Sequence, residues 1–261
     1  MAITFVGAST IVEVAGGTPI TLDTATITGL ADDDLMLFCV LEDDNIAIVS
    51  NDGLTESVQG GSGNRRMAVY RKVALTEGGT YSFQNTTPSN KEYTGVILAY
   101  RGVDTTTPED ATAQLVERAN DTTPAAATIT TVSDNAWVVT VLGSVNAGTT
   151  LHTGNQPAGY TIRADIANAG DRNLCAADLT KTPAGLETPG DWGDSAYTAT
   201  TDHVSITVAL KPAGDINIEA NTVAIAIVTY QSVVTFGTPS GSAELMKETA
   251  LGNSLIDGGL I

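Results

Sequence analysis

Apolar and polar residues alternate with a period of two along most of this chain. The alternation is clearest, and β-branched residues are most frequent, in residues 24–28, 66–73, 127–132 and 204–210. Successive side chains of a β-strand point to opposite faces of a sheet, so this period predicts strands. No helical pattern separates these segments within residues 1–213, and the pattern therefore favours antiparallel sheets over βαβ units.

Three largely apolar runs, residues 35–41, 96–100 and 137–142, the last with Thr140 inside it, predict central strands that are covered on both faces. Clusters of Gly, Asp, Asn, Ser and Thr between the runs predict tight turns. We expect residues 1–213 to form an all-β, antiparallel, jelly-roll-like β-sandwich, because the predicted strands outnumber those of an immunoglobulin domain. The alternation places one set of side chains on the inner faces of this sandwich: Leu37, Cys39, Val69, Val73, Ile97, Ala99, Val139, Val141, Ile206 and Val208.

The pattern changes after Leu-Lys-Pro-Ala at 210–213. Residues 216–236 have the pattern of three short strands, residues 237–242 that of an extended link, and residues 243–251 that of a short helix. So few short strands are marginally stable alone in water. The sequence therefore predicts that residues 214–261 are a C-terminal docking or oligomerisation segment, which pairs with a partner.

The chain has 261 residues, of which 42% are hydrophobic and 16% are charged, as is typical of a folded domain. Its 30 Asp and Glu against 12 Lys and Arg give a net charge of −18. Such an acidic surface repels nucleic-acid phosphates and anionic lipid headgroups, so we expect neither nucleic acid nor a membrane as a partner. The longest apolar runs, residues 35–41 and 223–228, are much shorter than the roughly 20 residues of a membrane-spanning helix.

Cysteine, histidine and carboxylate positions give little support for a metal site. Cys39 and Cys175 lie in apolar stretches, where free thiols are commonly buried, and the sequence leaves open whether they pair. With two histidines and no Cys-x-x-Cys pair, zinc has few ligands available, and we expect no cofactor. The carboxylates at 32–34 and 42–44 flank a predicted strand and would lie more than about 20 Å apart. We interpret them as solvated turn residues rather than as shared Ca²⁺ ligands.

The sequence predicts that the protein is not an enzyme. His152 and His203 are the two imidazoles that could serve a Ser-His-Asp arrangement, and no Gly-x-Ser-x-Gly turn accompanies them. Carboxylate pairs for glycoside hydrolysis can also be drawn, such as Asp165 with Asp171 or Asp178 and Glu187 with Asp191. A chain this acidic supplies such pairs by chance.

Trp192 and Tyr197 lie in a Gly-rich loop, residues 182–197. Aromatic rings on an exposed loop form platforms on which sugars stack, so these two residues are the candidate ligand-binding residues for a host glycan. The alternative is that both rings are hydrophobic plugs over one end of the sandwich.

Arg101 and Asp104 flank Gly102 directly after the apolar run 96–100. One interpretation is a salt bridge or a turn-capping bond across the glycine. The other is a buried arginine that fixes the end of the strand against a neighbouring loop.

Four blocks of the sequence resemble a recurrent module of structural proteins from tailed phages and prophages. They are Ile-Thr-Phe-Val-Gly-Ala-Ser at 3–9, Arg-Met-Ala-Val-Tyr-Arg-Lys-Val-Ala at 66–74, Val-Ile-Leu-Ala-Tyr-Arg-Gly-Val-Asp-Thr-Thr-Thr-Pro-Glu-Asp-Ala at 96–111, and residues 203–213 ending in Val-Ala-Leu-Lys-Pro-Ala. The most distinctive polar content lies in Leu-Ala-Tyr-Arg-Gly-Val-Asp at 98–104.

The resemblance implies a β-sandwich displayed on the virion surface, on the head or on the tail, and it supplies no catalytic residue. We expect a capsid decoration or head-spike protein whose residues 214–261 contact other virion proteins of the capsid or tail. A homo-oligomer fits such a display, with a trimer as one candidate state. The alternative is a carbohydrate-binding receptor module of a tail tip or fibre, which would use Trp192 and Tyr197.

Overall fold

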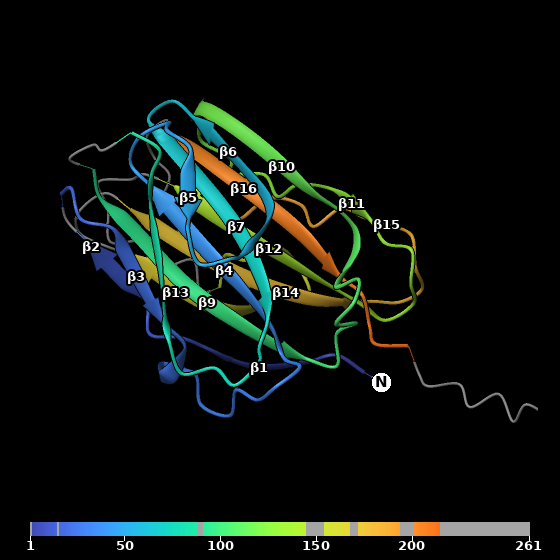
Figure 1. Ribbon diagram of the computed structural model, residues 1–261. Helices are drawn as coiled ribbons and strands as arrows, with labels where there is room; N and C mark the ends of the chain where they lie inside the picture. The colour runs from blue at the N-terminus through green and yellow to red at the C-terminus, as the bar shows by residue number, and fades with distance from the viewer. Residues whose placement is uncertain are drawn as a thin grey trace, which may run out of the picture. The chain divides into compact units, whose positions relative to one another are not determined.

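The computed structural model describes residues 2–14, 16–87, 91–144, 154–167, 172–193 and 201–214. These residues form an all-β protein whose antiparallel sheets pack together, as the period of two predicts (Figure 1). Apart from one short 3-10 turn, Thr24–Thr26, the described residues contain no helix. The described residues belong to one compact unit, and the strands and the helix predicted beyond residue 214 lie outside the described residues.

Two large sheets form the body of the protein, and every strand pairing in them is antiparallel. The first, here called the N-sheet, has the strand order β1-β9-β4-β7-β6, and β2 also pairs with β9. Its strands are β1 (Thr4–Ala8), β2 (Val12–Val14), β4 (Leu35–Glu42), β6 (Thr55–Ser62), β7 (Arg65–Val73) and β9 (Tyr93–Arg101).

The second large sheet, here called the C-sheet, has the strand order β10-β16-β12-β14-β13. Its strands are β10 (Glu109–Asp121), β12 (Ala136–Ser144), β13 (Thr161–Ala167), β14 (Asn173–Lys181) and β16 (Thr201–Leu210). Two small sheets accompany the large ones, with the orders β3-β8-β5 and β11-β15. Their strands are β3 (Ile20–Asp23), β5 (Ile48–Ser50), β8 (Thr80–Asn85), β11 (Ile129–Thr130) and β15 (Leu186–Glu187).

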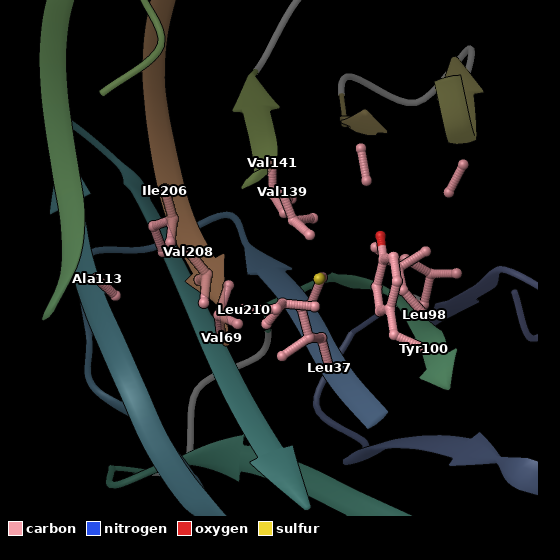
Figure 2. Packing of buried hydrophobic residues seen from close by; sticks show 14 of the residues in the cluster. Leu37, Val69, Leu98, Tyr100, Ala113, Val139, Val141, Ile206, Val208 and Leu210 are labelled. Atoms are coloured by element: carbon pink, nitrogen blue, oxygen red, sulfur yellow. The ribbon is translucent and has the colours of Figure 1, made fainter. Parts of the chain in front are cut away.

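The main hydrophobic core lies between the N-sheet and the C-sheet. Figure 2 shows Leu37 and Leu98 of the N-sheet in the same cluster as Val139, Ile206 and Val208 of the C-sheet. All five side chains are fully buried. Apolar area removed from water contributes roughly 25 cal/mol per Å², so this layer is the main source of stability for the sandwich.

The outer faces of both large sheets are covered as well. Phe38 and Ile97 pack with Phe83 of the small sheet β3-β8-β5 against the N-sheet. On the C-sheet, Val138 packs in one cluster with Trp192. The central strands β4, β9 and β12 are therefore covered on both faces, and the prediction made from the three apolar runs is confirmed.

Two residues predicted on the inner face, Ile97 and Ala99, lie on the outer face of the N-sheet instead. Their neighbours Leu98 and Tyr100 contact the main core. The prediction was wrong because an apolar run with no polar residue on either face carries no signal of register. The other predicted residues do contact the main core, with Val73 partly buried at its margin: Leu37, Cys39, Val69, Val73, Val139, Val141, Ile206 and Val208.

Two predicted strands also differ from the structure. Residues 24–28 begin with the 3-10 turn, because the Asp23 carboxylate accepts the backbone N–H of Ala25 at 2.9 Å and caps it. Of residues 127–132, only Ile129–Thr130 is a strand. Short β-branched stretches are ambiguous by pattern alone, and local side-chain bonds decide them.

The chain completes one large sheet before it begins the other. Strands β1 to β9 supply the N-sheet and the small sheet β3-β8-β5, whereas β10 to β16 supply the C-sheet and the pair β11-β15. Among the described strands, the chain therefore passes from one large sheet to the other between β9 and β10. A jelly roll is built from two interleaved Greek keys, and this strand order does not show that arrangement.

Candidate functional site

The most distinctive described site lies where β9 and β16 end and the chain reaches residue 214. Val103, two residues after β9, forms a β-bridge with Pro212, two residues after β16. The N–H of Asp104 donates to the carbonyl of Lys211 at 2.9 Å, and the N–H of Ala213 donates to the carbonyl of Gly102 at 2.8 Å. The two strand ends are thus fastened to each other by a short antiparallel ladder.

Arg101 fixes the end of β9 against a neighbouring loop. Its Nε and one terminal nitrogen donate to the two carboxylate oxygens of Asp34, each at 2.8 Å, and the guanidinium also donates to the carbonyl of Gly29 at 2.9 Å. Asp34 is fully buried, and the side chain of Arg101 is 48% exposed. The loop-anchoring interpretation therefore holds for the contact, although the guanidinium is half-exposed rather than buried.

The structure corrects two expectations here. Asp104 is not the partner of Arg101, because residues 101–104 turn so that the two side chains meet different elements. Asp34 is not a solvated turn residue, because it lies under Arg101 and also accepts the N–H of Ala31 at 2.9 Å. Burial of a carboxylate is tolerated when charged donors satisfy both its oxygens.

Asp104 organises the turn that follows β9. One carboxylate oxygen accepts the backbone N–H groups of Thr106 and Thr107 at 2.9 and 3.0 Å, and the other lies 3.0 Å from the ammonium of Lys211. The N–H bond from Thr107, followed by the bond to Lys211, lowers the pKa of Asp104 below its ordinary value. Asp104 consequently links the β9–β10 turn to the end of β16 through hydrogen bonds and an ion pair.

Gly102 lies where the backbone must pass close to the N-terminal segment. Its φ is +81°, and a Cβ at this position would come 2.5 Å from the carbonyl oxygen of Ala2. Both the left-handed conformation and the close approach require glycine. The structure thus explains why residue 102 is a glycine, which the alternation of polar and apolar residues does not reveal.

Two open pockets lie at this end of the sandwich. One, of about 480 Å³, is lined by residues 32–34, 101–105 and 213–214. The other, of about 470 Å³, is lined mainly by residues 2–3, 133–135 and 211–214. Both border residues 213–214, at which the predicted docking segment begins. Three of the lining side chains, Arg101, Asp104 and Lys211, are engaged in the ion pairs described above.

The structure describes one of the two candidate glycan-binding residues, Trp192. Trp192 has no exposed surface and packs in the cluster with Val138, Tyr160 and Cys175. Its backbone N–H donates to the carbonyl of Pro124 at 2.8 Å. A ring without an exposed face offers no platform to a sugar, so Trp192 takes the position of the hydrophobic plug. Tyr197 lies outside the described residues.

Of the histidines and carboxylates considered as catalytic candidates, some are buried in the described structure and others lie outside the described residues. His203 is fully buried opposite Ser144, and burial lowers its pKa; neither ring nitrogen has a hydrogen-bond partner among the described residues. His152 and Asp171 lie outside the described residues. Within the described ranges, no group of three or more His, Cys, Asp or Glu side chains is placed to hold a metal ion.

Two carboxylates proposed for acid–base pairs are engaged in ion pairs and hydrogen bonds. Asp178 is buried and accepts from Arg163 Nε at 2.7 Å and from the hydroxyl of Tyr100 at 3.1 Å. Glu187 lies 3.1 Å from the ammonium of Lys181. Asp178 closes one margin of the main core between the two large sheets. Its charged partner Arg163 is 15 residues away in sequence, and the alternation around residue 163 gave no signal of the contact.

Glu42 is a second correction among the expected turn carboxylates. It ends β4 with no exposed surface, and its carboxylate accepts the side-chain amide of Asn85. Burial is the main cause that raises the pKa of Glu42 to about 7, with a smaller contribution from Asp44 and Asp43. Sequence reasoning missed this group because Asn85 comes from β8, more than 40 residues away along the chain.

Both cysteines are free and fully buried. Burial raises the pKa of Cys39 to about 12 and that of Cys175 well above its ordinary value, so both thiols stay protonated at neutral pH. They lie on different faces: Cys39 faces the main core, and Cys175 belongs to the cluster around Trp192.

The part of the chain that the structure describes has no helix long and apolar enough to cross a membrane. Comparison of the chain with known protein families, with curated proteins and with solved structures finds no match.

Proposed function

We propose that the chain is a non-enzymatic structural protein of a tailed-phage virion, most directly a capsid decoration or head-spike protein. In this proposal residues 1–213 are the displayed β-sandwich, and residues 214–261 dock onto other virion proteins of the capsid or tail, with the protein itself forming a homo-oligomer on the virion surface. The partner would accept the segment by strand addition to its own sheet.

The observation that carries the proposal is the contact between blocks that resemble the phage module. Residues 96–111 contain β9 and its turn, residues 203–213 contain β16 and its end, and the two blocks meet in the Val103–Pro212 ladder. The block at residues 3–9 contains β1, which pairs with β9. The distinctive polar residues of the resemblance therefore support one structural unit, the fastened end from which the chain continues past residue 213.

The geometry of this end suits an anchor. A load on residue 214 passes to Ala213 and Pro212, which are hydrogen-bonded to the β9 end, and then to β16 within the C-sheet. Arg101 and Lys211 add ion pairs to Asp34 and Asp104 at the same place. A force on a segment attached here is therefore shared by the N-sheet and the C-sheet, and is not borne by a single edge strand.

Deletion of residues 214–261 tests the proposal. We expect the truncated chain to unfold cooperatively and to retain its far-UV circular dichroism, but to be absent from purified particles of the phage that encodes it. The measurement is quantitative mass spectrometry of particles that carry the wild-type or the truncated chain.

The matched control replaces residues 214–261 by a Gly/Ser segment of equal length, which keeps the chain length and removes the sequence. We expect this variant to be absent from particles as well. Normal incorporation of either variant contradicts the docking role. The glycan-receptor alternative now depends on Tyr197, and binding of the wild-type chain to a glycan array that is lost in Tyr197→Ala would favour it instead.

A further inference from the structure

We propose that residues 2–214 are two diverged copies of one β-module, fused head to tail, and that the two large sheets pack as a module does against its own second copy. The N-terminal half is residues 2–104, and the C-terminal half is residues 105–214. The interaction surface is the inner face of each large sheet, and the partner it fits is a second copy of the same module.

The two halves have the same strand order. The N-sheet runs β1-β9-β4-β7-β6 and the C-sheet runs β10-β16-β12-β14-β13, so in each half the first strand pairs with the last. Each half also contributes a pair of strands to a small sheet. In the N-terminal half, β3, which precedes β4 in the chain, pairs with β8, which follows β7. In the C-terminal half, β11, which precedes β12, pairs with β15, which follows β14. Strands β2 and β5 have no equivalent among the described strands of the C-terminal half.

The residue register agrees with the strand order. Leu35 at the start of β4 lies opposite Tyr100 of β9, and Trp137 in β12 lies opposite Leu210 of β16. In the next ladder Leu37 lies opposite residue 71 and Val139 lies opposite residue 178, which makes residues 71 and 178 equivalent. Equivalent residues also share a face: residues 35, 37 and 39 of β4, and residues 137, 139 and 141 of β12, contact the main core.

A β-bulge occurs at the same place in the first strand of each half. On β1 the extra residue is Val6, opposite the step from residue 100 to residue 99 of β9. On β10 the extra residue is Asp110, opposite the step from residue 210 to residue 209 of β16. These steps are equivalent in the register given above.

A second bulge recurs on the far edge strands. The extra residue on β6 is Ser57, opposite residues 69–70 of β7, and that on β13 is Arg163, opposite residues 176–177 of β14. These are again equivalent positions. Bulges insert one residue at a specific point of a ladder and are retained within families, so two shared bulges point to common descent rather than to a common strand pattern.

The turn before each central strand is the same as well. Asp33 has a φ of +68° and Asn135 has a φ of +62°, and the two residues occupy equivalent positions, each two residues before the equivalent pair Leu35 and Trp137. Non-glycine residues with positive φ are uncommon, and the described chain has only one other, Thr76.

The carboxylate that precedes each of these residues makes the same bond. Asp32 accepts the backbone N–H of Thr76 at 2.6 Å, and Asp134 accepts that of Ala184 at 2.7 Å. Thr76 and Ala184 both follow the fourth strand of their half, β7 or β14. In both halves, therefore, an aspartate in the turn before the central strand is hydrogen-bonded to the loop after β7 or β14.

The packing of the halves has the symmetry of a two-copy interface. Strand β6 lies along β10, as Figure 1 shows, and its equivalent β13 contacts β1, which is the equivalent of β10. At the fastened end, the segments that follow β9 and β16 run antiparallel through Val103 and Pro212, as two segments related by a two-fold axis would.

One contact lies where a residue would meet its own copy. Leu41 and Gly143 are equivalent in the register, and a Cβ on Gly143 would come 2.6 Å from a Cδ of Leu41. The space between the two positions is too small for two leucine side chains. It is filled by the side chain of Leu41 alone, because Gly143 has none. This size difference adapts the two copies to each other.

The test exchanges the two side chains in the full-length chain. Leu41→Gly opens a cavity and Gly143→Leu overpacks the same space, so each single variant lowers the midpoint of thermal unfolding. If the positions are equivalent, the double variant restores the packing with the roles reversed. We expect it to recover more than half of the summed loss of the two single variants, as a strong coupling in a double-mutant cycle.

The matched control exchanges a leucine and a glycine that touch but are not equivalent. A Cβ on Gly95 would lie 3.1 Å from a Cδ of Leu22, and these residues belong to β9 and β3. We expect the double variant Leu22→Gly with Gly95→Leu to recover little. Failure of the 41/143 exchange to recover stability, or equal recovery in the control exchange, overturns the proposal. If a single variant does not fold, Leu41→Ala and Gly143→Ala give the same cycle with smaller changes.

Discussion

The guanidinium of Arg101 holds both carboxylate oxygens of Asp34, so that the end of β9 and the turn before β4 are joined by a two-pronged ion pair. Bidentate pairs of this kind combine charge with fixed geometry. Asp34 is the buried member, and a buried carboxylate that loses its charge loses both charge-assisted bonds.

We expect Asp34→Asn to lower the free energy of unfolding by about 1–3 kcal/mol, because charge-assisted bonds to a buried group are replaced by weaker neutral ones. Urea unfolding at pH 7 measures the change. The neighbouring Asp33→Asn is the control, since Asp33 is exposed and Asn tolerates its positive φ. Similar losses for the two variants would contradict a specific role for Asp34.

Glu42 predicts a pH dependence that is opposite to that of an ordinary carboxylate. Its pKa rises from 4.5 to about 7 because of burial, so the folded state binds the proton more tightly than the unfolded chain. The stabilisation is fully present below about pH 4.5 and is lost as pH rises through about 7, by at most about 3 kcal/mol.

The variant Glu42→Gln should remove this dependence and flatten the stability curve between these pH values. The measurement is urea unfolding at several pH values, with Glu13→Gln as the control because Glu13 is exposed on β2. A wild-type curve that rises with pH over this range, or one that Glu42→Gln leaves unchanged, would show that another group dominates.

The sequence predicted the fold class because the alternation and the apolar runs are local features. It also placed most inner-face residues correctly, since a strand such as β16 shows a polar or small residue at alternate positions. It failed at residues 97 and 99 because both faces of β9 are buried and nothing in the run distinguishes them. Register in such a strand is decided by what packs on each face.

The contacts of the candidate site were less predictable. The turn made by Asp104 with Thr106 and Thr107 involves near neighbours, and a capping role at this position was one of the expectations. The partner of Arg101 lies 67 residues away, so no local pattern identifies it. Long-range ion pairs depend on which loops the topology brings to one end of the sandwich, and that depends on a strand order that a single sequence does not reveal.

Trp192 should behave as a core residue. Because the indole has no exposed surface, we expect Trp192→Ala to lower the free energy of unfolding by about 3–5 kcal/mol. Trp192→Phe keeps an aromatic ring and should lose clearly less. Guanidinium unfolding monitored by circular dichroism measures both variants. An alanine variant of wild-type stability would mean that the ring does not support the cluster with Val138 and Tyr160.

Gly102 offers the sharpest separation of backbone strain from steric overlap. Gly102 and Gly53 both have positive φ, +81° and +71°, but only Gly102 faces another backbone. A Cβ on Gly102 would lie 2.5 Å from the carbonyl oxygen of Ala2, whereas a Cβ on Gly53 would have nothing within 4 Å. Gly53→Ala should therefore lose only the left-handed penalty of about 1–2 kcal/mol. Gly102→Ala should lose at least twice as much, because the N-terminal segment is held by buried Ile3 and cannot move aside freely. Thermal unfolding of the two variants side by side decides the point: equal losses would mean that Ala2 yields to the new methyl group, and that the close approach at the end of β9 does not hold the N-terminal segment in place.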